Sequence, residues 1–191
     1  MTITKNNLDV MKELKIYAVK ASAKIPETDL MKVEEFCQEK SVRCKRFNWG
    51  HLVVFDRYTF TFFKKGEKSV SDQHVNIKKL TSLNIESAIK DLAWFIDAEP
   101  NHIFYNVDNI TAGSDLRTNI DLEKFILNNQ DISDLMNYNP ERFPGLFLRG
   151  EYGKVLLFKS GKMVFVGCKT NDQIEQLNEY MHQKCVNIWI V

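Results

Sequence analysis

Four cysteines and four histidines are the side chains best suited to catalysis or metal binding, and their spacing forms no recognisable site. The cysteines stand at positions 37, 44, 168 and 185, so the chain has no Cys-x-x-Cys pair. No histidine lies at zinc-ligand spacing from a cysteine. We therefore expect reduced thiols in an intracellular protein, and no metal site. The histidines, which we expect at surface or core positions, are His51, His74, His102 and His182.

Enzyme motifs are missing as well. The sequence contains no P-loop, no Gly-x-Ser-x-Gly elbow and no His-Glu-x-x-His pair. Gly145 and Gly150 lie where turns are expected, not in a phosphate-binding loop. The sequence predicts a protein that is not an enzyme, with no catalytic residues and no cofactor.

The composition is that of a folded protein of one or two small domains. The chain has 191 residues, of which 44% are hydrophobic and 27% charged. No apolar run approaches the roughly 18 residues that span a bilayer, and the first residues contain no apolar signal segment. We expect no membrane partner.

Charge is distributed unevenly between the halves. Residues 1–95 carry 17 basic and 12 acidic side chains, whereas residues 96–191 carry 9 and 13, for a net charge of +1. A protein that held DNA mainly by neutralising phosphates would usually be more basic. Of the 26 basic residues 20 are lysine, which is consistent with an AT-rich genome.

The order of predicted elements occurs twice and indicates an α+β fold. After an N-terminal segment, residues 1–13, each of residues 14–101 and 102–191 is predicted to contain a strand, a helix, three or more strands and a helix. In the first copy, residues 67–73 are interpreted as an inserted polar loop before a short strand, His74–Lys78. Matching positions recur at nearly constant spacing: Leu30 and Leu122 are 92 apart, Phe47 and Phe143 are 96 apart, and Phe63 and Phe158 are 95 apart.

Two strands of the second copy are apolar on both faces. In Val155–Phe158 and Met163–Val166 successive side chains are all apolar, although they point to opposite faces of a strand. A strand buried on both sides would explain this pattern. However, the predicted helices form only one layer, so an apolar face would remain uncovered. An exposed apolar face of this size is typical of an interaction surface.

Motifs in the second copy resemble the second repeat of the TATA-box-binding protein family. The resemblance rests on Asn109-Ile110, on residues 138–146 (Tyr-Asn-Pro-Glu-Arg-Phe-Pro-Gly-Leu), on Leu156-Leu157-Phe158 and on residues 160–169 (Ser-Gly-Lys-Met-Val-Phe-Val-Gly-Cys-Lys). It covers about residues 103–183. The first copy is similar only through Lys45-Arg46-Phe47, Phe63 and the element order.

The resemblance implies a saddle formed by two pseudo-symmetric repeats. One curved antiparallel sheet would bind the DNA minor groove, and the helices would lie on its convex face. The minor groove presents nearly the same acceptors for A·T and T·A, so side chains with few polar atoms can line it. Apolar wedges inserted between base steps would bend the duplex. The implied function is that of a TATA-box-binding-like transcription initiation factor.

Individual positions take their expected roles from this resemblance. Phe143 and Phe158 match the wedge pair of the second repeat, and Phe47 and Phe63 stand at the equivalent places of the first. Asn109 matches an asparagine that hydrogen-bonds to base acceptors. Groove-floor positions correspond to Val19, Thr111, Leu156, Val164 and Val166, and phosphate-contacting positions to Arg149, Ser160, Lys162 and Lys169.

Several departures affect the expected partners. Counting back from Leu30 as from Leu122 puts Tyr17 at the position where the first repeat of the family has its asparagine. The helix from Asn84 to Glu99 is acidic, whereas the corresponding helix of the family is basic. That helix receives transcription factor IIA in the family, so we do not expect this contact to be kept. The loop for transcription factor IIB keeps Glu141, but it has Asn139 and Arg142 where the family tends to have Glu and Leu. The expected partners are AT-rich double-stranded DNA, a factor IIB-like protein and the RNA polymerase machinery.

A second interpretation stays open. The fold could serve as a protein-interaction module of a transcription complex in which DNA binding is weakened or lost, as the departures and near-neutral charge would favour. The four phenylalanines at the expected wedge positions favour the DNA-binding interpretation. The divergence and AT-rich composition suggest a large DNA virus or a fast-evolving eukaryotic parasite, and hence a location in the nucleus or in a cytoplasmic viral factory or virion.

Overall fold

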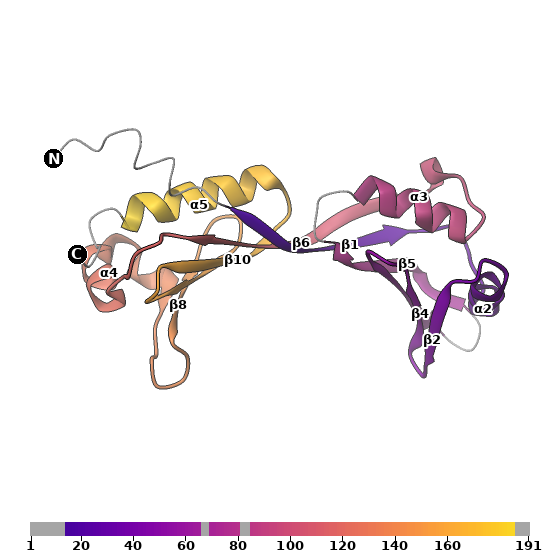
Figure 1. The fold of residues 1–191 in the computed structure, drawn as a ribbon, viewed down its shortest axis with the longest axis horizontal. Helices are drawn as coiled ribbons and strands as arrows, with labels where there is room; N and C mark the ends of the chain where they lie inside the picture. Colours follow the sequence, from indigo (N-terminus) through magenta and orange to yellow (C-terminus); the bar gives the residue numbers. More distant parts are fainter. Residues whose placement is uncertain (1–13, 66–68, 81–84, 186–191) are drawn as a thin grey trace. The chain divides into compact units, whose positions relative to one another are not determined.

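A computed structural model describes residues 14–65, 69–80 and 85–185 (Figure 1). The chain divides into two compact units. We call residues 18–108 the N-terminal unit, and the described residues 14–17 and 109–185 the C-terminal unit. The predicted boundary at 101/102 stays a prediction, and the predicted segment 1–13 lies outside the described residues.

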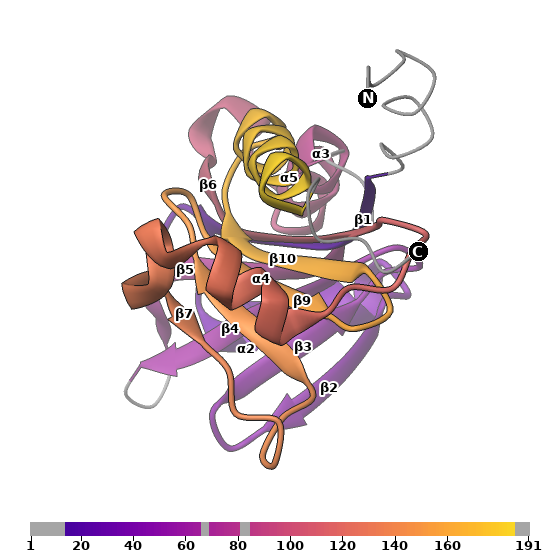
Figure 2. The same cartoon turned by 90° about the vertical axis from the view of Figure 1, so that its left-hand side faces the viewer.

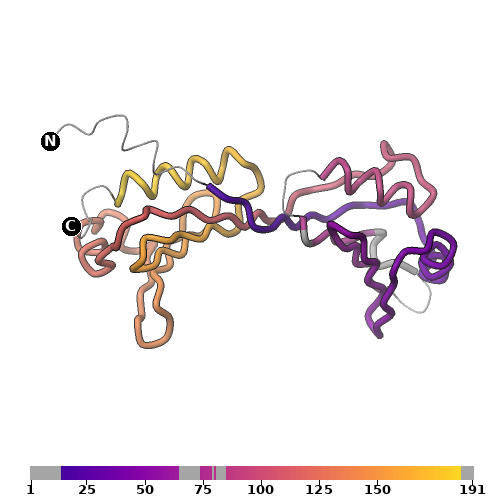
Figure 3. Tube along the Cα trace, in the orientation of Figure 1, coloured from indigo at the N-terminus to yellow at the C-terminus, as the bar shows by residue number. Residues whose placement is uncertain are grey.

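Both units are built from the same order of elements, traced in Figure 3. The first copy comprises β1 (Lys15–Lys24), α2 (Leu30–Glu39), β2 (Arg43–Phe47), β3 (Gly50–Val54), β4 (Thr59–Lys65), β5 (Ser69–Leu80), α3 (Ile85–Phe95) and the 3-10 helix η1 (Pro100–His102). The second comprises β6 (Phe104–Asp115), α4 (Leu122–Asn128), the 3-10 helix η2 (Gln130–Leu135), β7 (Met136–Asn137), β8 (Gly145–Arg149), β9 (Lys154–Phe158), β10 (Lys162–Cys168) and α5 (Asn171–Cys185).

Strand order is also the same in the two units. In the N-terminal unit it is β2-β3-β4-β5-β1, and in the C-terminal unit it is β7-β8-β9-β10-β6. The neighbours in these two runs pair antiparallel. Strands β1 and β6 each pass from one unit into the other, because the unit boundaries fall at Tyr17/Ala18 and Asp108/Asn109.

Local sequence explains the helix starts. Asp29 caps α2 by accepting a hydrogen bond from the backbone N–H of Met31. At the start of α4, Asp121 accepts hydrogen bonds from the backbone N–H groups of Glu123 and Lys124. The helices then bury one apolar stripe each, as the sequence predicts; in α2 it is Leu30, Val33 and Cys37.

One interpretation of the sequence was wrong. Residues 69–73, expected in a polar loop, belong to strand β5, and Lys65 pairs with Ser69 and Lys64 with Val70. The polar side chains of this segment misled the prediction, because a strand ladder is held by its backbone hydrogen bonds whatever the side chains are.

The helices cover one face of the strands in each unit. In the C-terminal unit, α5 lies against this face (Figure 2), and Ile174, Leu177 and Met181 are buried beneath it. The strand residues on the covered face are fully buried, and include Ile110, Ala112, Leu146, Leu148, Val155, Leu157, Met163 and Phe165. The residues between them along each strand point away from the helices and form the open face of the unit. None of the described helices has the length and apolar character needed to cross a membrane.

The two faces predict different responses to truncation. Phe165 is 0% exposed on the covered face, and replacing it with alanine should reduce the free energy of unfolding by about 3–5 kcal/mol. Phe147 is 41% exposed on the open face, and the same change there should cost about 1 kcal/mol or less. Denaturant unfolding of the two variants measures both. Equal losses would contradict the assignment of the faces.

Candidate nucleic-acid interface

The open face of the C-terminal unit is largely apolar although no described helix covers it. A row runs across four strands, since Phe147 pairs with Leu156, Leu156 with Val164, and Val164 with Gly113. Phe147 is exposed, and Leu156 and Val164 are half-buried. The expected groove-floor residues therefore do lie together. Val166 and Thr111, which pair with each other, continue this face beside the row.

Tyr17 covers the end of this row. A β-carbon added at Gly113 would lie 2.4 Å from Cε2 and from the hydroxyl oxygen of Tyr17, so only glycine leaves room for the ring. Gly113 is buried in spite of its place on the open face, because this ring lies over it. Tyr17 itself is 49% exposed. The strand β1 thus contributes an aromatic ring to the open face of the C-terminal unit.

Three phenylalanine rings meet at the end of this face. The ring centroids of Phe143 and Phe158 are 5.8 Å apart, and those of Phe143 and Phe147 are 4.9 Å apart. Gly145 lies between the first pair, because a β-carbon there would be 2.7 Å from Phe143 and 3.0 Å from Phe158. The structure therefore brings the two expected wedge residues together. Phe147 was missed, although the alternation from Leu146 to Arg149 could have revealed it.

The N-terminal unit contains a similar group of rings. Phe47 stacks on Trp49 with centroids 4.7 Å apart, and Trp49 lies 5.7 Å from Phe63. Trp49 stands in the two-residue turn between β2 and β3 and is 45% exposed. The two phenylalanines were expected, but sequence analysis missed the tryptophan. Its position in a tight turn between two strands, where a large apolar side chain is unusual, was the available signal.

Asn109 is held in one orientation by its neighbours. The backbone N–H of Gly167 donates to its Oδ1 at 2.6 Å, and its Nδ2 donates to Oγ1 of Thr111 at 3.1 Å. Gly167 is free to do so because the pairing of β10 with β6 shifts there and its φ is +102°. Since a backbone N–H can only donate, the amide oxygen must face it, and Nδ2 keeps a second N–H for an outside acceptor.

The expected phosphate-contacting side chains are exposed around this face. Arg149 ends β8, Lys162 begins β10, Ser160 lies in the turn before it, and Lys169 follows β10. Within residues 14–65, 69–80 and 85–185, the three cations of this group form no ion pair. They are therefore available to an anionic partner.

Val19 contradicts the sequence-based assignment. It is 1% exposed and belongs to the covered face with Ala21 and Ala23, so it cannot contact DNA. The burial pattern Val19, Ala21, Ala23 matches Ile110, Ala112, Ser114, which places Ala18, and not Tyr17, at the position of Asn109. Counting from the helices was wrong by one residue, and one residue exchanges the faces of a strand.

The open face of the N-terminal unit is more polar. Its pairs include Thr61 with Asn76 and Asn76 with Ser22, where the other unit has leucine, valine and glycine. Lys20, Lys24 and Lys78 are exposed on the same strands. This face therefore differs in chemistry from its counterpart.

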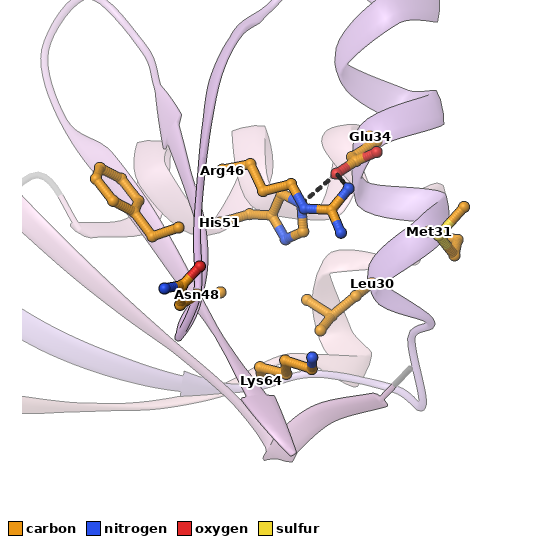
Figure 4. Close-up of a pocket in the computed structure, with 9 residues that line it drawn as sticks. Leu30, Met31, Glu34, Arg46, Asn48, His51 and Lys64 are labelled. Carbon is orange, nitrogen blue, oxygen red and sulfur yellow. Dashed lines mark hydrogen bonds and ion pairs between the residues drawn. The ribbon is translucent and has the colours of Figure 1, made fainter. Parts of the chain in front are cut away.

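A charged cluster fixes the hairpin that carries Phe47 (Figure 4). Oε1 of Glu34, on α2, lies 2.7 Å from Nε2 of His51 and 3.2 Å from Nη1 of Arg46. These residues line a pocket of about 540 Å³. His51 is buried, so its hydrogen bond, and secondarily the charge of Arg46, hold the pKa of Glu34 below its usual value. The lone histidine has a structural role here.

The cluster predicts a pH dependence of stability. Because the folded-state pKa of Glu34 is lowered, its contribution is present above the unfolded-state pKa and is lost as the pH falls through the folded value. Glu34→Gln should therefore lower the melting temperature at neutral pH by about 2–4 °C, if the cluster contributes near 1 kcal/mol. The difference from the parent should shrink below about pH 4. Melting curves against pH test this, and a difference that does not change with pH would contradict it.

The remaining candidates for metal or thiol chemistry do not assemble. Cys37, Cys44, Cys168 and Cys185 are free, and burial raises the pKa of Cys185 to about 12. Among the described residues, no three His, Cys, Asp or Glu side chains are placed to hold a metal ion.

Comparison with known proteins connects this geometry to one family. Residues 104–185 match the family model described as transcription factor TFIID (or TATA-binding protein, TBP). The TATA-box-binding protein of Methanothrix thermoacetophila is 29% identical over 185 residues, which are 93% of this chain and 98% of that protein. The protein of the same name from Pyrococcus abyssi is 36% identical over 94 residues, 48% of this chain and 47% of the relative. In that match, and in the one to Pyrococcus horikoshii, the chain spans about half of the relative's length (47%).

A solved structure shares the fold. The Methanococcus jannaschii TBP superposes with a TM-score of 0.69 over 92% of this chain and 99% of that chain, at 21% sequence identity. The α+β fold expected from the sequence is therefore confirmed. The family model matches the second copy, where the open face is apolar.

Proposed function

We propose that the chain is a member of the TATA-box-binding protein family, that it binds the minor groove of AT-rich DNA and that it acts as a transcription initiation factor. The observation that carries the proposal is the uncovered apolar face of the C-terminal unit with three aromatic rings at its end. The chain is not an enzyme on this proposal, and its work is binding and deforming DNA.

The chemistry of the open face suits A·T pairs. In the minor groove these pairs present only acceptors and leave the floor smooth, whereas guanine adds a protruding amino group. Leu156, Val164 and Val166 can approach such a floor without leaving a polar group unpaired. Asn109 supplies a donor toward the acceptors.

The aromatic rings supply the bend. Phe143 and Phe158, whose rings meet over Gly145, would enter a base step, and Phe147 would support Phe143 through its ring contact. Unstacking a step costs free energy, which the larger area of groove contact offsets. Phe47 and Phe63, with Trp49, would act at a second step.

Protein partners are part of the same proposal. The connection between β7 and β8 contains Asn139, Glu141 and Arg142, all exposed, and would receive a factor IIB-like protein that links to the polymerase. Helix α3 includes Glu86 and is followed by the exposed Asp97 and Glu99. This acidic helix would not bind an acidic partner of the kind that a basic helix binds.

Protein interaction without DNA is the second candidate. Two features of the N-terminal unit favour it: the alanine at the position matching Asn109, and an open face with fewer apolar groups. The test below separates the two candidates. Viral or parasite origin, and location in the nucleus or a viral factory, remain proposals from the sequence.

Truncating the wedges should affect DNA and not folding. We expect Phe143→Ala/Phe158→Ala to reduce affinity for a TATA duplex by about tenfold or more, near 1.4 kcal/mol, and to reduce bending in parallel. Anisotropy and end-to-end energy transfer on a labelled duplex measure the two effects. Leu127→Ala, at a 70% exposed position on α4, is the control.

Two outcomes would contradict the wedge mechanism. One is a double variant that bends the duplex as well as the parent. The other is a large loss of thermal stability, which would assign the rings to the core. A parent protein that binds no DNA at low salt would favour the protein-interaction candidate.

The salt dependence should be shallow for a minor-groove protein. Each phosphate contact adds roughly 0.9 to the slope of log K against log salt, and the C-terminal unit offers Arg149, Lys162 and Lys169. We expect a slope no steeper than about −6, and a reduction of about 1 for Lys169→Ala. Titrations at several salt concentrations measure it, and an unchanged slope in the variant would exclude Lys169 from phosphate contact.

A further inference from the structure

A polar row crosses the open face of the N-terminal unit. Leu52 pairs with Thr61, Thr61 with Asn76, and Asn76 with Ser22, so one side chain from each of β3, β4, β5 and β1 is aligned. The row ends at Asp108 of β6, whose Oδ1 accepts a hydrogen bond from Oγ of Ser22 at 2.9 Å.

The C-terminal unit has the equivalent row with opposite chemistry. There the strands β8, β9, β10 and β6 contribute Phe147, Leu156, Val164 and Gly113. That row ends at Tyr17 of β1, which lies over Gly113. Because strand order is the same in both units, Asp108 occupies the place in one row that Tyr17 occupies in the other.

The carboxylate of Asp108 keeps capacity for another hydrogen bond. Its side chain is 32% exposed, and Oδ2 lies 3.8 Å from Nζ of Lys20, which is an ion-pair distance and too long for a hydrogen bond. An ionised carboxylate is an acceptor only. A partner at this position must therefore donate.

The minor groove has only one donor to offer. Adenine, thymine and cytosine present acceptors there, and the guanine 2-amino group is the exception. A carboxylate facing A·T acceptors would lose water without gaining a hydrogen bond, which is costly. A carboxylate that faces the guanine 2-amino group gains a hydrogen bond.

We infer that Asp108 accepts a hydrogen bond from the amino group of a guanine, so that the half of the site under the N-terminal unit includes a G·C pair. The inference rests on the proposed DNA-binding function and adds to it a specificity-determining residue. It makes the preferred site chemically asymmetric: A·T pairs under the apolar row, and a G·C pair under the polar one. Such a site fixes the direction in which the protein lies on DNA.

Replacing guanine with inosine tests the contribution of the 2-amino group alone. An I·C pair has the major-groove edge of G·C but lacks the 2-amino group. Duplexes carrying A·T, G·C or I·C at each position in turn are titrated with the full chain, and thermal unfolding of every variant confirms that it folds. For the parent we expect one position at which G·C binds about five- to tenfold tighter than I·C, the effect of one added charged hydrogen bond.

Two substitutions then test the residue. Asp108→Asn can still accept from Ser22 and gains an N–H, so the preference at that position should reverse toward A·T and I·C. Asp108→Ala should remove the difference. Asp134→Asn, at an exposed position in η2, is the matched control and should retain the parent's preference.

The outcomes separate this inference from the proposed function. Binding of TATA duplexes without any position that prefers G·C over I·C would overturn the inference and leave the function standing. A preference that persists in Asp108→Ala would also overturn it, because another residue would then be the reader. A parent that binds none of the duplexes would overturn both.

Discussion

In each unit, the helices pack against only one face of the strands. The other face stays open, and in the C-terminal unit this open face is the candidate interface. A strand alternates its side chains between two faces, so β9 and β10, which are apolar at every position from Val155 to Leu157 and from Met163 to Val166, have twice the apolar surface that one helix layer can cover. Val155, Leu157, Met163 and Phe165 enter the core, and their neighbours Leu156, Val164 and Val166 remain half-buried at most. These neighbours add little to the core, and the proposed binding of DNA would give their apolar character a use.

The duplicated architecture lets each unit be compared with the other position by position. Burial requires apolar side chains on the covered face of both units. Val53, Phe60 and Ile77 are fully buried in the N-terminal unit, as their counterparts are in the C-terminal unit. The open faces carry no such constraint and have diverged. A buried alanine is kept at both Ala21 and Ala112, whereas the open position beside each is lysine in one unit and threonine in the other, at Lys20 and Thr111. The open faces therefore differ in chemistry more than the covered faces do, and on the proposed function this difference would affect binding.

The sequence predicted the fold and most of the strongly matched face because both depend on periodicity and on short local motifs. The pairing of Phe143 with Phe158 came from the family resemblance of residues 138–146 and of Leu156-Leu157-Phe158. Side chains whose role depends on cross-strand neighbours could not be assigned in this way. Phe147 and Trp49 were not assigned, because only the folded hairpins bring their rings against Phe143 and Phe47. Val19 was misassigned since a helix start does not fix the phase of a strand, and the loop between β1 and α2 need not equal that between β6 and α4 in length.

Net charge was a poor guide to the interface because it ignores where the charges lie. The basic half, residues 1–95, uses part of its positive charge in ion pairs: Arg46 pairs with Glu34 of the same half, and Lys20 and Lys40 pair with Asp108 and Asp97 of the acidic half. The acidic C-terminal half carries much of its negative charge on the helices, as at Glu123 on α4 and at Asp172, Glu175 and Glu179 on α5, while Arg149, Lys162 and Lys169 stand around the open face. A phosphate backbone responds to the local potential over distances near the Debye length, about 10 Å at 0.1 M salt. It would therefore meet a positive rim on the half of the chain whose net charge is negative. On the proposed function, the apolar floor between those cations would decide which base pairs the groove can present.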